Sequence, residues 1–229
     1  MGICASLSTP YDRKYPKSTV RTSSEAVYSR FRDGDCAFFK QARAKIQRDY
    51  ILVVDRSGSM RGSNWVEAEE AVRYFARHIC EFDPDGITLI FFDNEIVNFQ
   101  NVKDPDFIAR AFQEHPPRGS TNLASALHTC FLEHFGGKRG ATTVLAITDG
   151  VPDSREDVAQ RIKDAANSIT SDEELSLSII QVGGDQRARE WLRILDDELE
   201  CAFDIVDVVV PAELIGMTFE QVIQKSLAD

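Results

Sequence analysis

The chain has 229 residues and a formal net charge of −11 at pH 7, a size that suits one compact domain with an appended segment. The charge is uneven: residues 1–50 hold ten of the 26 basic and five of the 37 acidic residues, so the remainder holds 16 and 32. An acidic body would be repelled by a phosphate backbone, which argues against nucleic-acid binding. No apolar run reaches the roughly 18 residues that a transmembrane helix needs.

Residues 1–45 predict a flexible basic arm, because they are polar and show no periodicity. The opening "MGICAS" fits Met-Gly-x-x-x-Ser, so Gly2 is a candidate for myristoylation and Cys4 for palmitoylation. One myristoyl chain binds membranes only marginally, at roughly 10⁴ M⁻¹, and stable anchoring takes a second signal. Cys4 and the basic arm could each supply this second signal, so the sequence predicts attachment to the cytoplasmic face of a membrane. The alternatives are an ordinary disordered terminus or an internal start site.

The cysteines are five, scattered and without a CxxC pair. They predict neither a zinc ribbon nor a disulfide framework, and they favour a reducing, cytoplasmic setting.

Residues 46–229 predict one α/β domain in which strands alternate with helices. Apolar runs rich in β-branched and aromatic residues predict strands at 50–55, 86–93, 141–149, 175–183 and 203–210. Amphipathic stretches predict helices at 64–82, 105–114, 122–135, 155–169, 186–198 and 211–226. This alternation predicts a doubly wound, mostly parallel sheet with helices on both faces. Residues 94–100 follow the second strand too closely for a crossover helix, so we expect an antiparallel edge strand.

Ligands of doubly wound sheets gather at the carboxyl ends of the strands. Three predicted loops at that edge carry oxygen-bearing side chains. "DRSGSM" supplies Asp55, Ser57 and Ser59, "RGSTNLASAL" supplies Thr121, and "ITDG" supplies Asp149. Hydroxyls and carboxylates without His or Cys suit Mg²⁺, Mn²⁺ or Ca²⁺ rather than zinc. The alternative without a metal is that Asp55 is only a helix cap and that the Ser/Gly loop after it is only a turn. Asp93, which ends the second strand, is either an outer group of this site or a turn residue.

These motifs resemble the metal-ion-dependent adhesion site of a von Willebrand factor type A (vWA) domain: Asp-x-Ser-x-Ser, the Thr of "GSTNLASAL" and "TDG" all match. The resemblance covers about residues 46–229. The later part of the sequence, with "LSIIQVGG" and "FDIVDVV", also resembles a group of intracellular, stand-alone vWA proteins. It implies a Rossmann-like, six-stranded sheet and a noncatalytic Mg²⁺ ion that captures an acidic side chain of a partner protein. It also implies that Ser57, Ser59 and Thr121 bind the ion directly or nearly so, and that Asp55 and Asp149 act partly through water.

Two other functions stay open. A strand that ends in aspartate before a Ser-rich loop is also similar to haloacid dehalogenase-like phosphatases, in which Asp55 would be the nucleophile. Those enzymes need a second Asp two positions later, where this chain has Ser57, so we expect no enzyme. The third hypothesis is a scaffold with a vestigial metal site. No GxxxxGK[ST] or GxGxxG motif is present, so nucleotide binding has no support.

Overall fold

The computed structural model describes residues 48–79, 85–137 and 140–209. The predicted arm at 1–45 and the predicted helix at 211–226 therefore lie outside the described residues. The described strands are β1 (Arg48–Asp55), β2 (Ile87–Phe92), β3 (Ile96–Val102), β4 (Ala141–Thr148), β5 (Leu175–Gln181) and β6 (Val206–Val209). The helices are α3 (Ser63–Ile79), α4 (Pro105–Glu114), α5 (Leu123–Gly136), α6 (Arg155–Ala166) and α7 (Gln186–Asp197), with single 3₁₀ turns η2 (Gly58–Met60) and η3 (Asp172–Glu174).

The strands form one six-stranded sheet in the order β3-β2-β1-β4-β5-β6. All neighbouring pairs are parallel except β2 and β3, which are antiparallel. The predicted antiparallel edge strand is therefore confirmed as β3. Strand order reverses between β1 and β4, so the crevice at their carboxyl ends is where a doubly wound sheet binds ligands.

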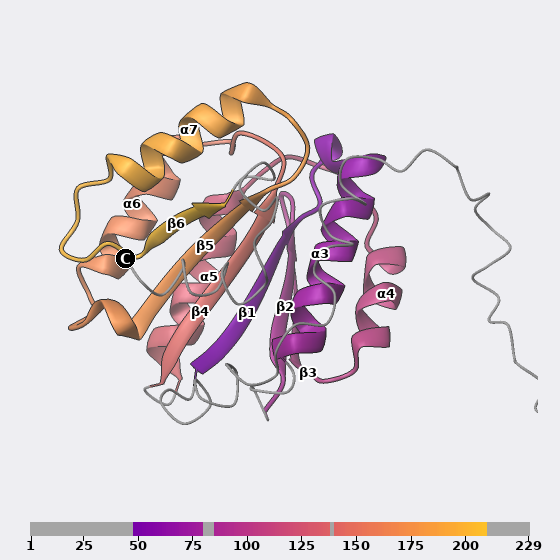
Figure 1. The fold of residues 1–229 in the computed structure, drawn as a ribbon, viewed down its shortest axis with the longest axis horizontal. Coiled ribbons are helices and arrows are strands. Elements are labelled where there is room, and N and C mark those ends of the chain that lie inside the picture. Colours follow the sequence, from indigo (N-terminus) through magenta and orange to yellow (C-terminus); the bar gives the residue numbers. More distant parts are fainter. Residues whose placement is uncertain (1–47, 80–84, 138–139, 210–229) are drawn as a thin grey trace, which may run out of the picture.

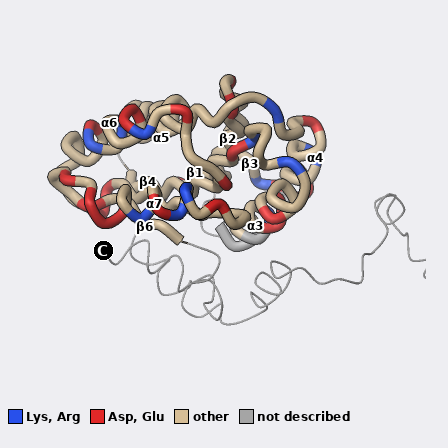
Figure 2. Tube along the Cα trace, turned by 90° about the horizontal axis from the view of Figure 1, so that it is seen from above, with Lys and Arg blue, Asp and Glu red and all other residues tan. Residues whose placement is uncertain are grey.

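Helices cover both faces of the sheet (Figure 1). Viewed from above, α3 and α5 lie on opposite sides of the strands (Figure 2). Apolar residues of α3 and α4 pack with one face of the sheet, and those of α5, α6 and α7 pack with the other. β2 and β5 are buried along their whole length. β2 is accordingly a nearly continuous apolar run, "ITLIFF", whereas the start of β5 alternates leucine with the buried serines Ser176 and Ser178.

Several helices begin at side chains that accept hydrogen bonds from the first turn, as helix N-termini require. Ser154 caps α6 by accepting from the backbone N–H of Asp157. Asp104 and Asp185 cap α4 and α7 in the same way. None of the described helices combines the length and apolar character that a membrane crossing requires.

Candidate metal centre

Asp55 is the last residue of β1 and is fixed by hydrogen bonds to both of its carboxylate oxygens. The backbone N–H of Ser57 donates to Oδ1 at 2.7 Å, and the hydroxyl of Thr148 donates to Oδ2 at 2.6 Å. Thr148 ends β4, the strand beside β1. The side chain is therefore held between the two strands at which the sheet order reverses.

A chain of hydrogen bonds joins Ser57, Ser59 and Asp149. The Ser57 and Ser59 hydroxyl oxygens lie 2.9 Å apart, and Ser59 donates to Asp149 Oδ1 at 2.8 Å. Ser59 has only one hydroxyl proton, so Ser57 is the donor between the two serines. These three predicted ligands thus meet at one place although they come from two loops.

Thr121 lies on a third loop that is attached to the first by backbone hydrogen bonds. Gly58 donates to the carbonyl of Gly119 at 3.1 Å, and Arg118 donates to the carbonyl of Arg56 at 2.6 Å. The N–H of Thr121 donates to Asp153 Oδ1 at 3.0 Å. The structure therefore brings all three predicted loops to the same edge of the sheet.

Two of the predicted ligands are buried carboxylates. Asp55 is fully buried and Asp149 is 6% exposed, yet within the described ranges neither forms an ion pair with a basic side chain. Burial raises the pKa of Asp55 to about 6 against the hydrogen bonds from Thr148 and Ser57, and the charge of Asp149 raises it further. Buried charges are normally paired or coordinate metals, so the site is suited to a cation.

The chemistry of the donors fits a hard divalent cation. Every predicted ligand offers oxygen, and the set contains two carboxylates and three hydroxyls. Within the part of the chain that the structure describes, no group of three or more His, Cys, Asp or Glu side chains is arranged to hold a metal. A site here would consequently depend on hydroxyls as much as on carboxylates.

Three further residues contact this site and were not predicted from the sequence. Thr148 donates to Asp55, Asn64 Nδ2 donates to Asp149 Oδ2 at 2.7 Å, and Asp153 accepts from Thr121. Asn64 belongs to the first turn of α3, where its sequence position resembles that of an ordinary capping residue. Only its position as a polar residue directly after the apolar run "VLAI" of β4 could have pointed to Thr148.

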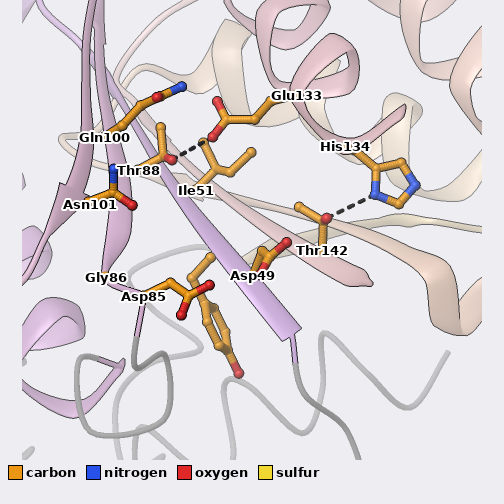
Figure 3. Close-up of a pocket in the computed structure, with 11 residues that line it drawn as sticks. Asp49, Ile51, Asp85, Gly86, Thr88, Gln100, Asn101, Glu133, His134 and Thr142 are labelled. Carbon is orange, nitrogen blue, oxygen red and sulfur yellow. Dashed lines mark hydrogen bonds between the residues drawn. The ribbon is translucent and has the colours of Figure 1, made fainter. Parts of the chain in front are cut away.

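The described residues also form a pocket of about 190 Å³, but it lies at the opposite edge of the sheet (Figure 3). It is lined by the amino-terminal parts of β1, β2 and β4, with residues of β3 and α5. Thr88 donates to Glu133 at 2.6 Å, and His134 Nδ1 lies 2.8 Å from the Thr142 hydroxyl. Burial lowers the pKa of His134. No predicted metal ligand lines this pocket.

Comparisons with known proteins agree with this architecture. Residues 50–151 match the family model of the von Willebrand factor type A domain. A search of curated proteins finds no match. Among solved structures, the chain is similar to a von Willebrand factor type A protein from Catenulispora acidiphila (16% identity, TM-score 0.55, 74% of this chain and 40% of that one). It is also similar to manganese-loaded TRAP protein from Plasmodium vivax (18% identity, TM-score 0.55, 74% of this chain and 70% of that one). A third similar structure is the SpRpn10 VWA domain (13% identity, TM-score 0.51, 74% of this chain and 94% of that one).

The fold and the edge site together define a doubly wound α/β domain with oxygen-bearing loops at its switch point. Residues 50–151, somewhat less than half of the chain, match the von Willebrand factor type A model, and the described sheet and helices have the Rossmann-like fold of such domains. Domains of this family are often protein-interaction modules and are generally not enzymes. The chain spans 40% of the Catenulispora protein.

Proposed function

We propose that this domain binds a partner protein through a divalent cation, Mg²⁺ in the first instance, with Mn²⁺ or Ca²⁺ as substitutes. Asp55, Ser57, Ser59, Thr121 and Asp149 would hold the ion, and an Asp or Glu of the partner would complete its coordination. The observation that carries this proposal is the pair of buried carboxylates, Asp55 and Asp149, which have no basic partner in an ion pair among the described residues. Asp55 accepts from the backbone N–H of Ser57, whose hydroxyl is linked through that of Ser59 to Asp149. A manganese-loaded protein of the same fold is consistent with it.

The charge of the chain makes this mode of binding dependent on the ion. Beyond residue 50 the chain holds 32 acidic against 16 basic residues, so an acidic partner is repelled over much of the surface. Two carboxylates only balance one divalent cation, and hydroxyl ligands add no charge. The ion therefore remains attractive to a further carboxylate, and its removal abolishes the attraction.

The geometry does not favour the alternative in which Asp55 is a phosphatase nucleophile. Asp55 is fully buried, and both of its carboxylate oxygens already accept hydrogen bonds from protein donors. A nucleophile must approach the reacting atom directly, whereas Asp55 could act on a metal ion partly through water. The vestigial-scaffold alternative differs by predicting no metal affinity.

A calorimetric titration of the full chain with Mg²⁺ and Mn²⁺ tests the ion. We expect saturable binding that is lost in Asp149→Ala and weakened in Thr121→Ala. Asp106→Ala, which removes an exposed carboxylate from the first turn of α4, is the matched control and keeps full affinity. Absence of binding by the wild-type chain contradicts the proposal and favours the scaffold.

Water-proton relaxation of bound Mn²⁺ tests capture of a carboxylate. Bound Mn²⁺ with an open position relaxes exchanging water, and an incoming carboxylate displaces that water. We expect excess acetate to lower the relaxation enhancement and acetamide, its uncharged counterpart, to leave it unchanged. Equal effects of the two would contradict capture of an acidic side chain.

We also propose that the basic arm attaches the chain to the cytoplasmic face of a membrane through acylation of Gly2 and Cys4. The support is the sequence motif with its adjacent cysteine and basic residues. Both residues lie outside the described part of the chain. Metabolic labelling, designed in the Discussion, tests this proposal.

A further inference from the structure

Asp93 directly follows β2 and is fully buried, although it is not among the predicted ligands. Its carboxylate accepts hydrogen bonds from three residues. Glu95 donates its backbone N–H to Oδ1 at 2.6 Å, Arg118 Nε donates to Oδ2 at 3.2 Å, and Arg56 Nη2 donates to Oδ1 at 3.4 Å. Arg56 Nε also lies 3.3 Å from Oδ2, as an ion pair without hydrogen-bond geometry.

The two arginines belong to the loops that carry the predicted metal ligands. Arg56 stands between Asp55 and Ser57 and is only 2% exposed, whereas Arg118 precedes Thr121 by three residues and is 58% exposed. Backbone hydrogen bonds complete the attachment: Arg56 donates to the carbonyl of Phe92, and Asn122 donates to that of Asp93. One carboxylate therefore joins the end of β2 to both ligand loops.

Close packing at Gly119 strengthens this arrangement. Gly119 has φ of +70°, and a Cβ there would lie 2.3 Å from Asn94 Oδ1 and 3.0 Å from Asp93 Cβ. Only glycine fits such a conformation and approach without strain. The Thr121 loop is thus seated directly on Asp93.

The charges in this cluster balance. Arg56 and Arg118 face Asp93 and Glu95, with Arg118 Nη2 2.6 Å from Glu95 Oε2 and Arg56 Nη2 3.9 Å from it. A buried ion pair contributes little net stability, but removal of one partner leaves an uncompensated charge. Without the charge of Asp93, the buried Arg56 guanidinium keeps only the distant, exposed Glu95.

We propose that Asp93, through Arg56 and Arg118, is a positioning residue that holds the Ser57–Ser59 loop and the Thr121 loop in register for the metal ion. This inference rests on the proposed function. Asp93 would not contact the ion itself. It would fix the relative positions of the Ser57, Ser59 and Thr121 hydroxyl oxygens in the metal-free protein. Groups that orient metal ligands typically change affinity about 10- to 100-fold when they are removed.

The test compares three variants of the full chain by calorimetry with Mn²⁺. Asp93→Asn keeps the shape and an acceptor for Glu95 but removes the charge, and we expect about tenfold weaker binding. Arg118→Gln alters an exposed side chain and keeps the fold, and we expect it to lower the Mn²⁺ affinity less. In the double variant, Arg118→Gln should cause no further loss of affinity beyond that of Asp93→Asn, because the two residues act through one contact. Arg110→Gln is the control, since Arg110 is also 58% exposed and pairs with Asp104 at 3.2 Å, but on α4.

Amide hydrogen exchange of the metal-free chain supplies a second readout. Gly58 and Arg118 donate the backbone hydrogen bonds between the two loops, so their amides should exchange faster in Asp93→Asn and Arg118→Gln than in Arg110→Gln. Unchanged Mn²⁺ affinity or unchanged exchange in both variants, with wild-type binding intact, overturns this inference alone. A wild-type chain that binds no Mn²⁺ overturns the proposed function and this inference with it.

Discussion

The hydroxyl of Ser59 donates a 2.8 Å hydrogen bond to Asp149, across 90 positions of sequence. Ser59 belongs to the single turn η2 after β1, and Asp149 follows β4. The contact therefore spans the point where strand order reverses, and it links a hydroxyl with one of the two buried carboxylates of the site.

We expect Ser59→Ala to weaken Mg²⁺ and Mn²⁺ binding by about tenfold, roughly 1.4 kcal/mol, with little change in the free energy of unfolding. Ser59 is exposed, so the substitution removes a proposed ligand without opening a cavity. Calorimetry measures the affinity, and thermal melting measures the stability. Ser125→Ala, at an exposed serine of α5, is the control. Equal affinities of the two variants would remove Ser59 from the ligand set.

Asp55→Asn should abolish metal binding while stabilising the metal-free protein at neutral pH. The folded-state pKa of Asp55 is about 6, above the ordinary 3.8. A raised pKa contributes stability that is complete below the ordinary pKa and is lost as pH rises through about 6. At pH 7.5 the ionised form therefore costs on the order of 2 to 3 kcal/mol, which the isosteric Asn avoids.

The measurement is thermal melting in EDTA from pH 4 to pH 8. Wild type should lose stability relative to Asp55→Asn across that range, and the two curves should converge at the acidic end. A variant that melts below wild type at pH 7.5 would contradict this prediction. Addition of Mg²⁺ should stabilise wild type alone, because ligand binding to the folded state raises its stability.

Gly119→Ala should weaken metal binding and destabilise the chain. The residue has φ of +70°, and a methyl group there would meet the Asn94 side chain and Asp93. The Thr121 loop must then move, at a cost of about 1–3 kcal/mol for the strained backbone. Calorimetry and thermal melting measure both effects. Gly136→Ala is the control, since nothing lies within 4 Å of a Cβ built there. A normal affinity in Gly119→Ala would mean that the loop has another stable position.

Acylation of the arm is testable in cells with an alkyne analogue of myristate and a tagged chain that begins at Met1. Gly2→Ala should abolish labelling and release the protein from the membrane fraction. Cys4→Ser should keep the label but weaken attachment, because a single myristoyl chain binds only marginally. Ser6→Ala, which alters the end of the motif while keeping both acyl acceptors, indicates how much the motif contributes. Labelling that survives in Gly2→Ala would refute the proposal.

The sequence predicted the sheet well because its signals are strong and local. β1 and β2 contain the apolar runs "YILVV" and "ITLIFF", and β3 was inferred from the absence of room for a helix between 93 and 96. The ends of elements were less accurate: the predicted strand 203–210 is only Val206–Val209. A run such as "FDIVDVVV" does not mark the residue at which pairing with β5 starts, because pairing depends on the neighbouring strand.

Four of the predicted ligands could be chosen from sequence because each ends or follows a strand, and Thr121 because it comes just before a helix in a motif that matches the resemblance. Their contacts could not, because those depend on the three-dimensional arrangement of the loops. Asn64 reaches Asp149 only because α3 begins beside the carboxyl end of β4. The double contact of Asp93 with Arg56 and Arg118 depends likewise on β2 lying beside β1.

The direction of β1 separates the two ends of the molecule. The strand begins at Arg48 and ends at Asp55, and at about 3.3 Å per residue its ends lie roughly 23 Å apart. Everything that precedes Arg48 joins the domain at the edge away from the metal loops. A lipid anchor at Gly2 would therefore be connected to the domain at the edge opposite the candidate metal loops, so the tether would not have to pass over them.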